Sequence, residues 1–331
     1  MLLTLPNKTK QFFFVLIKLS IVVGAAYFIY EKLTANENID FQSFIHFLSE
    51  TDIFSTKNIV FLLVLTSFNW FFEILKWKNL VNLIKQITFF EALKQSLAAL
   101  TSSLFTPNRI GDYGVKAIYY KRSLRKRILL LNLISNMAQM SVTLVFGIIG
   151  FSLFITKYNV AISYLSLLRY ITLIAIIIIL ITVGILYNKF SARGFSMTRI
   201  KAFIKKITTI THLKNVLFSV FRYLIFSFQF YYLLLIFGTE LSYYEAMIII
   251  TSMYLFVSMI PTIFVFDVVV KGGVALYLFN FVGVDNLTIL SITMLMWLLN
   301  FVLPSVIGSY YVLNFDFQKD LSTIPITRNN L

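Results

Sequence analysis

Three charged residues at helical spacing stand inside an otherwise apolar stretch in the first half of the chain. Arg109, Asp112 and Lys116 follow one another at i, i+3 and i+7, a spacing that puts all three on one face of a helix. Thr106 can cap that helix, and the proline after it suits the first helical position because no N–H is needed there. An arginine fork is a bidentate donor for phosphate, and a neighbouring Asp–Lys pair can hold it or exchange partners with it. The pattern therefore predicts an anion-binding face.

The residues before this face, 89–105, form an apolar run roughly long enough to enter a bilayer. One interpretation is a helix that enters the membrane, breaks at the turn 106–109 and returns to the same side. Irregular backbone at membrane depth is tolerated only where it is buried in protein or lines a wet cavity. The other interpretation is a short cytoplasmic loop whose charges are solvated. The pattern by itself leaves both interpretations open.

A second apolar stretch, 258–279, contains the same features in the same order. A proline interrupts it, Asp267 follows, and Lys271 comes four residues after the aspartate, as Lys116 does after Asp112. Val, Phe and Ile surround these charges, where an unpaired charge is costly. Two interrupted apolar segments in corresponding halves of a membrane protein point to a central binding site. We therefore predict that the second pair serves one half of the molecule as the first pair serves the other.

The composition sets the class of protein. The chain has 331 residues, of which 59% are hydrophobic and only 13% charged, and its mean hydropathy is +0.83. These values are typical of a polytopic membrane protein. The net charge of +15 lies in loops, where membrane topology explains it, so no nucleic-acid partner is expected. The absence of cysteine excludes disulfides and thiol nucleophiles, and two distant histidines predict neither a metal site nor a cofactor.

The elements that must position the charged residues are apolar runs of membrane-spanning length. We expect a single all-α integral membrane domain over 1–331, with about six full spans and two broken, re-entrant helix pairs. The first run follows two lysines and has no clear cleavage site after it, which favours an uncleaved span over a signal peptide. The full spans are expected at about 12–30, 59–75, 129–155, 167–187, 216–237 and 287–313.

Several polar residues lie inside these expected spans. Glu73 can pair with Lys76 one turn later, and we expect the two to form an ion pair at the membrane interface. Asn132, Asn136 and Gln139 share one face of a later span. Polar side chains of this kind usually bond neighbouring helices, although such a face can also line a polar cavity.

Basic residues gather in regions that alternate with the spans. Most of them fall at the N-terminus, in 76–127, in the basic loop 188–214 and in the tail, which are therefore expected in the cytoplasm. Both termini are then cytoplasmic, and the two broken segments approach opposite faces of the membrane. The two halves, about 1–156 and 163–315, are expected to be inverted copies. A topology with eight or more spans is the alternative if the broken pairs cross the membrane fully.

The stretch FTPNRIGDYGVK resembles the motif Thr-Pro-Gly-Arg-x-Gly-Glu-x-x-x-Arg of the lysylphosphatidylglycerol synthase transmembrane-region family, also called flippase-like. Asn108 stands at the first Gly of the motif, Asp112 at its Glu and Lys116 at its last Arg, so the charge types are retained. Span order and the Trp-rich end of the second span extend the resemblance over nearly the whole chain. The late segment departs from the family: a Gly-rich Pro-x-x-x-Gly-Gly-x-Gly pattern followed by Arg-Glu is common there, whereas this chain has PTIFVFDVVVKGG.

This resemblance implies a multi-pass protein of the plasma (inner) membrane that handles polar lipids and moves them between leaflets. Its expected partners are membrane lipids of the anionic phospholipid or polyprenyl-phosphate type. The family includes the N-terminal membrane part of the multiple peptide resistance factor, whose soluble aminoacyl-transferase domain has no counterpart in this sequence, so lysyl-lipid synthesis is not expected. The residues expected to bind the lipid are Thr106, Asn108, Arg109, Asp112, Lys116, Asp267 and Lys271.

Two other classes of function remain open. One is a non-catalytic membrane scaffold. The other is an intramembrane lipid-linked transferase, which would need a general base near its substrate. Asp112, Asp267 and Glu73 are the acids in membrane segments that such a role would use. No paired-carboxylate signature, metal cluster or nucleotide-binding loop accompanies them.

Overall fold

The computed structural model describes residues 52–103, 106, 110–158, 197–260 and 264–315, where every regular element is a helix. The side chains of 197–201 and 264–269 lie outside this description, as do the spans expected at 12–30 and 167–187. In chain order the elements are η2 (Asp52–Phe54), α3 (Thr56–Val81), α4 (Phe89–Ser103), α5 (Ile110–Ile118), α6 (Arg125–Tyr158), α8 (Met197–Lys206), α9 (Thr209–Ile236), α10 (Tyr243–Met259), α11 (Phe264–Phe279), η4 (Asn280–Val282), α12 (Asn286–Trp297), the π-helix η5 (Leu298–Val302) and α13 (Leu303–Leu313).

Four stretches of helix in the described part of the chain are long and apolar enough to cross a membrane: α3, α6, α9 and the continuous run from α12 to α13. They cover the spans expected at 59–75, 129–155, 216–237 and 287–313, which confirms an all-α helical bundle. The last of these runs contains a feature that the apolar pattern does not reveal. The π-helix η5 interrupts its regular hydrogen bonding just before Pro304.

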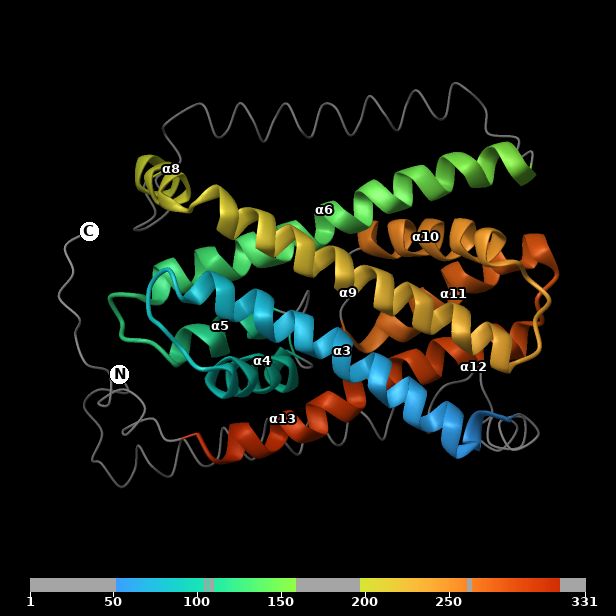
Figure 1. Cartoon of the computed structure of the whole chain (residues 1–331), viewed down its shortest axis with the longest axis horizontal. Coiled ribbons are helices and arrows are strands. Elements are labelled where there is room, and N and C mark those ends of the chain that lie inside the picture. The colour runs from blue at the N-terminus through green and yellow to red at the C-terminus, as the bar shows by residue number, and fades with distance from the viewer. Residues whose placement is uncertain (1–51, 104–105, 107–109, 159–196, 261–263, 316–331) are drawn as a thin grey trace.

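The helices α3 and α9 pack along one another in opposite directions, and α6 lies against α9 (Figure 1). Polar contacts mark both ends of the α3–α9 pair. The Tyr232 hydroxyl donates to Asn58 Oδ1 at 2.6 Å near the start of α3. Near its end, the Asn79 amide donates to the backbone oxygen of Thr211 at 3.1 Å. These two helices form the middle of the bundle.

Two pairs of shorter helices lie at opposite ends of the long helices. Figure 1 shows α4 and α5 at one end and α10 and α11 at the other. With 15 and 9 residues, α4 and α5 are about 22 and 14 Å long. Neither length reaches across a hydrocarbon layer of about 30 Å, so each of these two helices covers part of the membrane depth at most.

Glycines allow two close helix contacts. A Cβ on Gly147 of α6 would come within 2.6 Å of the Leu255 Cβ on α10, and one on Gly150 would overlap the Thr251 side chain. On α13, a Cβ on Gly308 would overlap the Leu97 backbone oxygen of α4. Small residues at such positions let membrane helices approach backbone to backbone. The pairs α6–α10 and α4–α13 are therefore held in tight contact.

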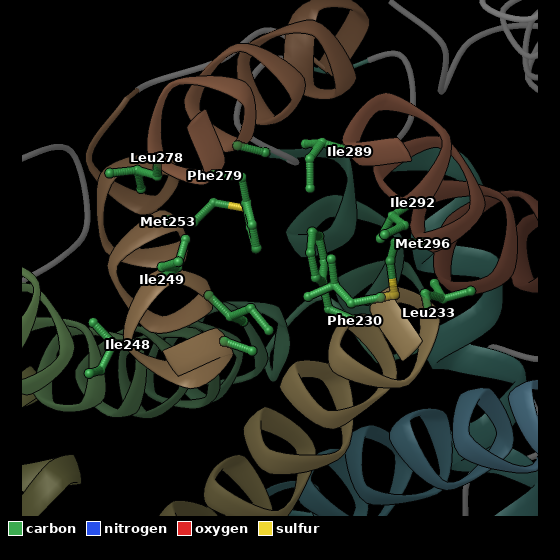
Figure 2. Close-up of a cluster of buried hydrophobic side chains, with 14 of the residues drawn as sticks. Phe230, Leu233, Ile248, Ile249, Met253, Leu278, Phe279, Ile289, Ile292 and Met296 are labelled. Atoms are coloured by element: carbon green, nitrogen blue, oxygen red, sulfur yellow. The ribbon is translucent and has the colours of Figure 1, made fainter. Parts of the chain in front are cut away.

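The apolar core of the α10–α11 end gathers side chains from α9, α10, α11 and α12. Figure 2 shows Phe230, Met253, Phe279, Ile292 and Met296 converging there. At the α4–α5 end, a second cluster is built around the fully buried Trp77.

Candidate functional site

The start of α5 is fixed against the end of α4 by Thr106. Its hydroxyl accepts a hydrogen bond from the Gly111 backbone N–H at 2.7 Å and donates to the Ser103 backbone oxygen at 3.1 Å. Gly111 permits this approach, because a Cβ there would come within 2.6 Å of the Ser102 backbone oxygen. The predicted helix is present, its described part begins at Ile110, and Thr106 accepts the N–H of the second residue of that part.

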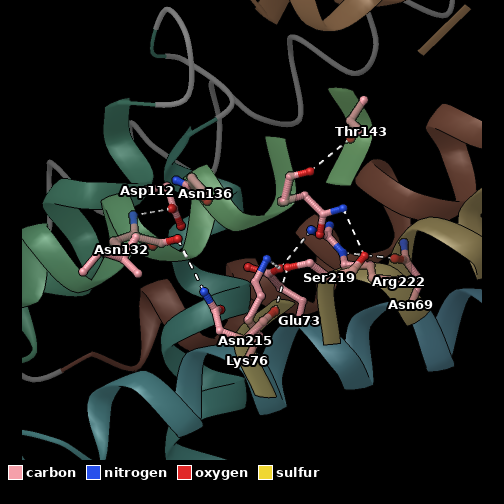
Figure 3. A network of polar contacts seen from close by, with 12 residues as sticks. Asn69, Glu73, Lys76, Asp112, Asn132, Asn136, Thr143, Asn215, Ser219 and Arg222 are labelled. Atoms are coloured by element: carbon pink, nitrogen blue, oxygen red, sulfur yellow. Dashed lines mark hydrogen bonds and ion pairs between the residues drawn. The ribbon is translucent and has the colours of Figure 1, made fainter. Parts of the chain in front are cut away.

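A buried ion pair extends from α5 to α6. Lys116 Nζ lies 3.1 Å from Asp112 Oδ1, and it donates to the Asn132 side-chain oxygen at 2.9 Å. The Asn132 amide in turn donates to Asp112 Oδ2 at 2.7 Å (Figure 3). Lys116 is 2% exposed and also lies 4.6 Å from the centre of the Trp77 ring. Asp112 and Lys116, which the sequence places at i and i+4, form an ion pair, and the lysine is held from three sides.

A second group of charges links α3 and α9. Glu73 Oε2 lies 2.8 Å from Lys76 Nζ and 2.8 Å from Arg222 Nη1. Arg222 Nε also donates to Asn69 Oδ1 at 3.0 Å. The expected Glu73–Lys76 pair is present, but it lies inside the bundle, since the lysine side chain is only 1% exposed. The sequence spacing paired the Glu73 carboxylate with Lys76 only, and the structure adds Arg222 as its second cation.

The two charged groups face each other across a cavity of about 250 Å³. Five helices contribute to its wall: α3, α4, α5, α6 and α9. The residues that line it are Trp70, Glu73, Ser96, Leu100, Asp112, Tyr113, Lys116, Asn136 and Arg222. The Asn136 amide donates to the Tyr113 hydroxyl at 2.9 Å, whereas the buried Ser96 hydroxyl has no hydrogen-bond partner among the described residues. The cavity therefore combines fixed charges with an available hydroxyl.

The charges in and beside this cavity do not cancel. Lys116, Arg222 and the adjacent Lys76 carry three positive charges, against two negative charges on Asp112 and Glu73, counting the described residues only. An unbalanced charge in a low-dielectric interior is costly unless a counter-charge or water compensates it. The arrangement thus favours binding of a small anion.

The structure brings together some of the residues predicted to bind the lipid and separates others. Asp112 and Lys116 line the cavity, and Thr106 holds the helix that carries them. Asn108 and Arg109 fall outside the described residues. The backbone of Asp267 belongs to α11, but its side chain is not described.

Lys271 lies away from the large cavity. Its Nζ is 4.8 Å from the centre of the Phe301 ring, at a void of about 30 Å³ that Tyr254 also lines. A space of this size holds one or two water molecules. Among the described residues, the roomy polar cavity lies at the α4–α5 end, whereas the void at Lys271 is small and lined mostly by apolar and aromatic side chains.

The residue that sequence reasoning left out of the site is Arg222. It is the sole basic residue within the apolar run 216–237, and an ionisable residue inside a membrane helix is a functional candidate by default. That signal could have identified it. Its partners could not be identified in the same way, because Arg222 and Glu73 are separated by 149 residues.

Comparison with known proteins agrees with these features. The sequence matches the family described as lysylphosphatidylglycerol synthase TM region over residues 15–308. No curated protein matches the chain. The match covers most of the sequence, including the helices that build the cavity, and it agrees with the motif resemblance at 105–116. The chain is therefore an integral membrane protein that belongs to the lysylphosphatidylglycerol synthase transmembrane-region family, a family related to lipid modification or transport.

Proposed function

We propose that this protein binds the phosphate-bearing head group of a membrane lipid in the cavity between α3, α4, α5, α6 and α9, and moves that lipid between leaflets. The observation that carries the proposal is the surplus positive charge in and beside the cavity, which the adjacent Lys76 adds to the balanced charges of the wall. A singly charged phosphodiester would neutralise it. Moving such a group across about 30 Å of hydrocarbon requires a polar path that satisfies its charge.

The geometry of the cavity suits a head group better than an acyl chain. Its volume of about 250 Å³ is many times the space needed by one water molecule. Arg222 is well suited to phosphate, because a guanidinium presents planar paired donors, and Ser96 offers a hydroxyl without a partner among the described residues. The acyl chains of the lipid would remain in the bilayer while the head group enters.

The ion pairs at the wall give the site a means of exchange. Arg222 is held by Glu73 and Lys116 by Asp112, so each cation has a carboxylate to return to when the anion leaves. Binding would then trade one negative partner for another, without exposing an unpaired charge to the membrane interior. Asp112 and Lys116 keep the binding roles proposed for them from the sequence, while Thr106 acts by holding α5. The roles of Asn108, Arg109 and Asp267 remain proposals, and Lys271 lies at the small void instead of at this cavity.

Reconstitution tests the function directly. The purified protein is placed in vesicles with a tail-labelled fluorescent phosphatidylglycerol, and an impermeant reductant bleaches the outer leaflet at intervals. We expect the inner-leaflet label to become accessible faster than in protein-free vesicles. Equal rates with and without protein would reject transport of this lipid class and favour a scaffold.

A further inference from the structure

A chain of buried uncharged side chains continues from the cavity into the middle of the bundle. The Asn69 amide donates to Asn300 Oδ1 at 2.8 Å, and the Asn300 amide donates to Gln229 Oε1 at 2.9 Å. The Gln229 amide donates to the Thr66 hydroxyl at 2.9 Å. We call these four residues, Thr66, Asn69, Gln229 and Asn300, the amide seam. Arg222 joins the seam to the cavity, since it contacts Asn69 through Nε and Glu73 through Nη1.

The seam crosses a substantial part of the membrane depth. Thr66, Asn69 and Glu73 stand at i, i+3 and i+7 on one face of α3, so seven residues separate the far end of the seam from the cavity. Seven residues of α-helix rise about 10 Å, roughly a third of the hydrocarbon thickness. The seam leads away from the α4–α5 end of the bundle toward the start of α3. Beyond the seam, the Asn58–Tyr232 contact lies still closer to the start of α3.

Simple attachment of helices does not require this arrangement. A polar residue in a membrane helix usually bonds one neighbour, and such bonds are individually weak. Here three primary amides with 0 to 3% exposure bond one another in sequence, and each is on a different helical element. A hydrogen-bonded network of this kind can specify how the core packs, but its continuity with the charged cavity through Arg222 favours a functional role.

The middle member of the series, Asn300, stands on an irregular element. Asn300 lies within the π-helix η5, and its backbone oxygen accepts a hydrogen bond from Trp70 Nε1 at 3.2 Å. Trp70 itself lines the large cavity, and Phe301, the next residue, lines the small void at Lys271. The π-helix therefore contacts a residue of the large cavity and contributes a residue to the small void. Wide turns of this kind are found frequently at functional sites.

We propose that the amide seam is the closed continuation of the head-group path, a second binding station that opens when η5 moves. This inference rests on the proposed transport function. In the open seam, the carboxamide N–H groups of Asn69, Asn300 and Gln229 would donate to phosphate oxygens instead of to their present partners within the seam. Arg222 already contacts both stations. Its guanidinium can therefore exchange Glu73 for the anion while it keeps its hydrogen bond to Asn69.

Replacement of Gln229 tests the seam without altering the cavity wall. Gln229→Leu removes the amide farthest from Arg222, and Asn215→Leu is the matched control. Asn215 is also buried on α9, but its amide reaches the Ile134 backbone oxygen of α6 outside the seam. Phosphatidylglycerol bound to each purified variant is measured by native mass spectrometry, and its transfer between leaflets is measured in vesicles.

We expect Gln229→Leu to bind phosphatidylglycerol as the unmodified protein does, and to transfer it at least about tenfold more slowly, because buried partners are left unpaired along the path. Asn215→Leu should retain both properties. If Gln229→Leu transfers the lipid at the unmodified rate, the seam is only a helix contact, and the proposal falls while the cavity function stands. If the unmodified protein transfers no lipid, both proposals fall.

A cysteine in the seam gives a second measurement that does not depend on the stability of the Gln229 variant. The chain has no cysteine, so Thr66→Cys introduces a single thiol of similar size at the far end of the seam. Ser291→Cys places a thiol at another fully buried site, on α12. We expect a small anionic thiosulfonate reagent to modify Cys at 66, faster when phosphatidylglycerol is present, and not to modify Cys at 291. No modification at 66 would overturn the proposal.

Discussion

Among single residues, Arg222 has the largest number of proposed tasks, since it balances Glu73, contacts the amide seam and lines the cavity. We expect Arg222→Gln to lower lipid transfer in vesicles by about tenfold or more, because a charge-assisted bond to phosphate contributes about 1.5–3 kcal/mol. Lys214→Gln, an exposed change of the same charge on the same helix, should transfer lipid at the unmodified rate. Equal losses in both variants would show that overall charge matters and the cavity arginine does not.

The pair Asp112–Lys116 gives a prediction about stability. Asp112→Asn leaves a buried lysine without its carboxylate, and we expect it to lower the free energy of unfolding by about 3–5 kcal/mol. Replacing both residues, with Asp112→Asn and Lys116→Met, should regain most of that loss because no charge is left unpaired. Unfolding in detergent, followed by tryptophan fluorescence, measures both. If the double variant is no more stable than Asp112→Asn alone, the unpaired charge of Lys116 is not the cause of the loss.

Among the elements, much of the architecture follows from the sequence. The long apolar runs define α3, α6, α9 and the α12–α13 run because membrane-spanning length is a strong signal. The i, i+4 spacing gives the Asp112–Lys116 pair, since that contact is local to one helix. Contacts between distant helices do not follow in this way. The Arg222–Glu73 and Asn69–Asn300 contacts depend on how the bundle packs, which a single sequence does not encode in any local pattern.

The π-helix η5 shows a second limit. Nothing in the run LLNFV distinguishes it from ordinary apolar helix, apart from the asparagine and the nearby proline. Its widened turn accompanies the contacts that Asn300 makes with α3 and α9. The sequence therefore predicts that this span exists and where it lies, but not the irregular turn inside it.

The close contact between α4 and α13 gives a prediction at this scale. Gly308→Ala would push a methyl group into the Leu97 backbone oxygen and the Thr101 hydroxyl, and we expect a loss of about 1–3 kcal/mol in the free energy of unfolding. Gly273→Ala, on the exposed side of α11, meets nothing within 4 Å and should gain up to about 1 kcal/mol through helix propensity. Denaturation in detergent compares the two, and equal stabilities would mean that the α4–α13 contact is looser than described.

For the whole molecule, the charges of the loops suggest an orientation in the membrane. The turn between α5 and α6 is strongly basic, whereas Glu240 lies between α9 and α10, Glu245 stands in the first turn of α10 and Asp285 caps α12. Positive loops stay on the cytoplasmic side. We expect a cysteine at Ser123 to be labelled by an impermeant reagent only from the cytoplasm, and one at Glu240 only from outside. Labelling of both from the same side would contradict the predicted approach of the two broken segments to opposite faces.

The glycine contacts have a consequence for how the molecule can move. Each of the two closely packed pairs, α4–α13 and α6–α10, combines one helix from the first half of the chain with one from the second. If one half rocked as a rigid body against the other, both contacts would have to separate. We therefore expect the moving bodies to be the two mixed pairs, which shift relative to each other on either side of α3 and α9.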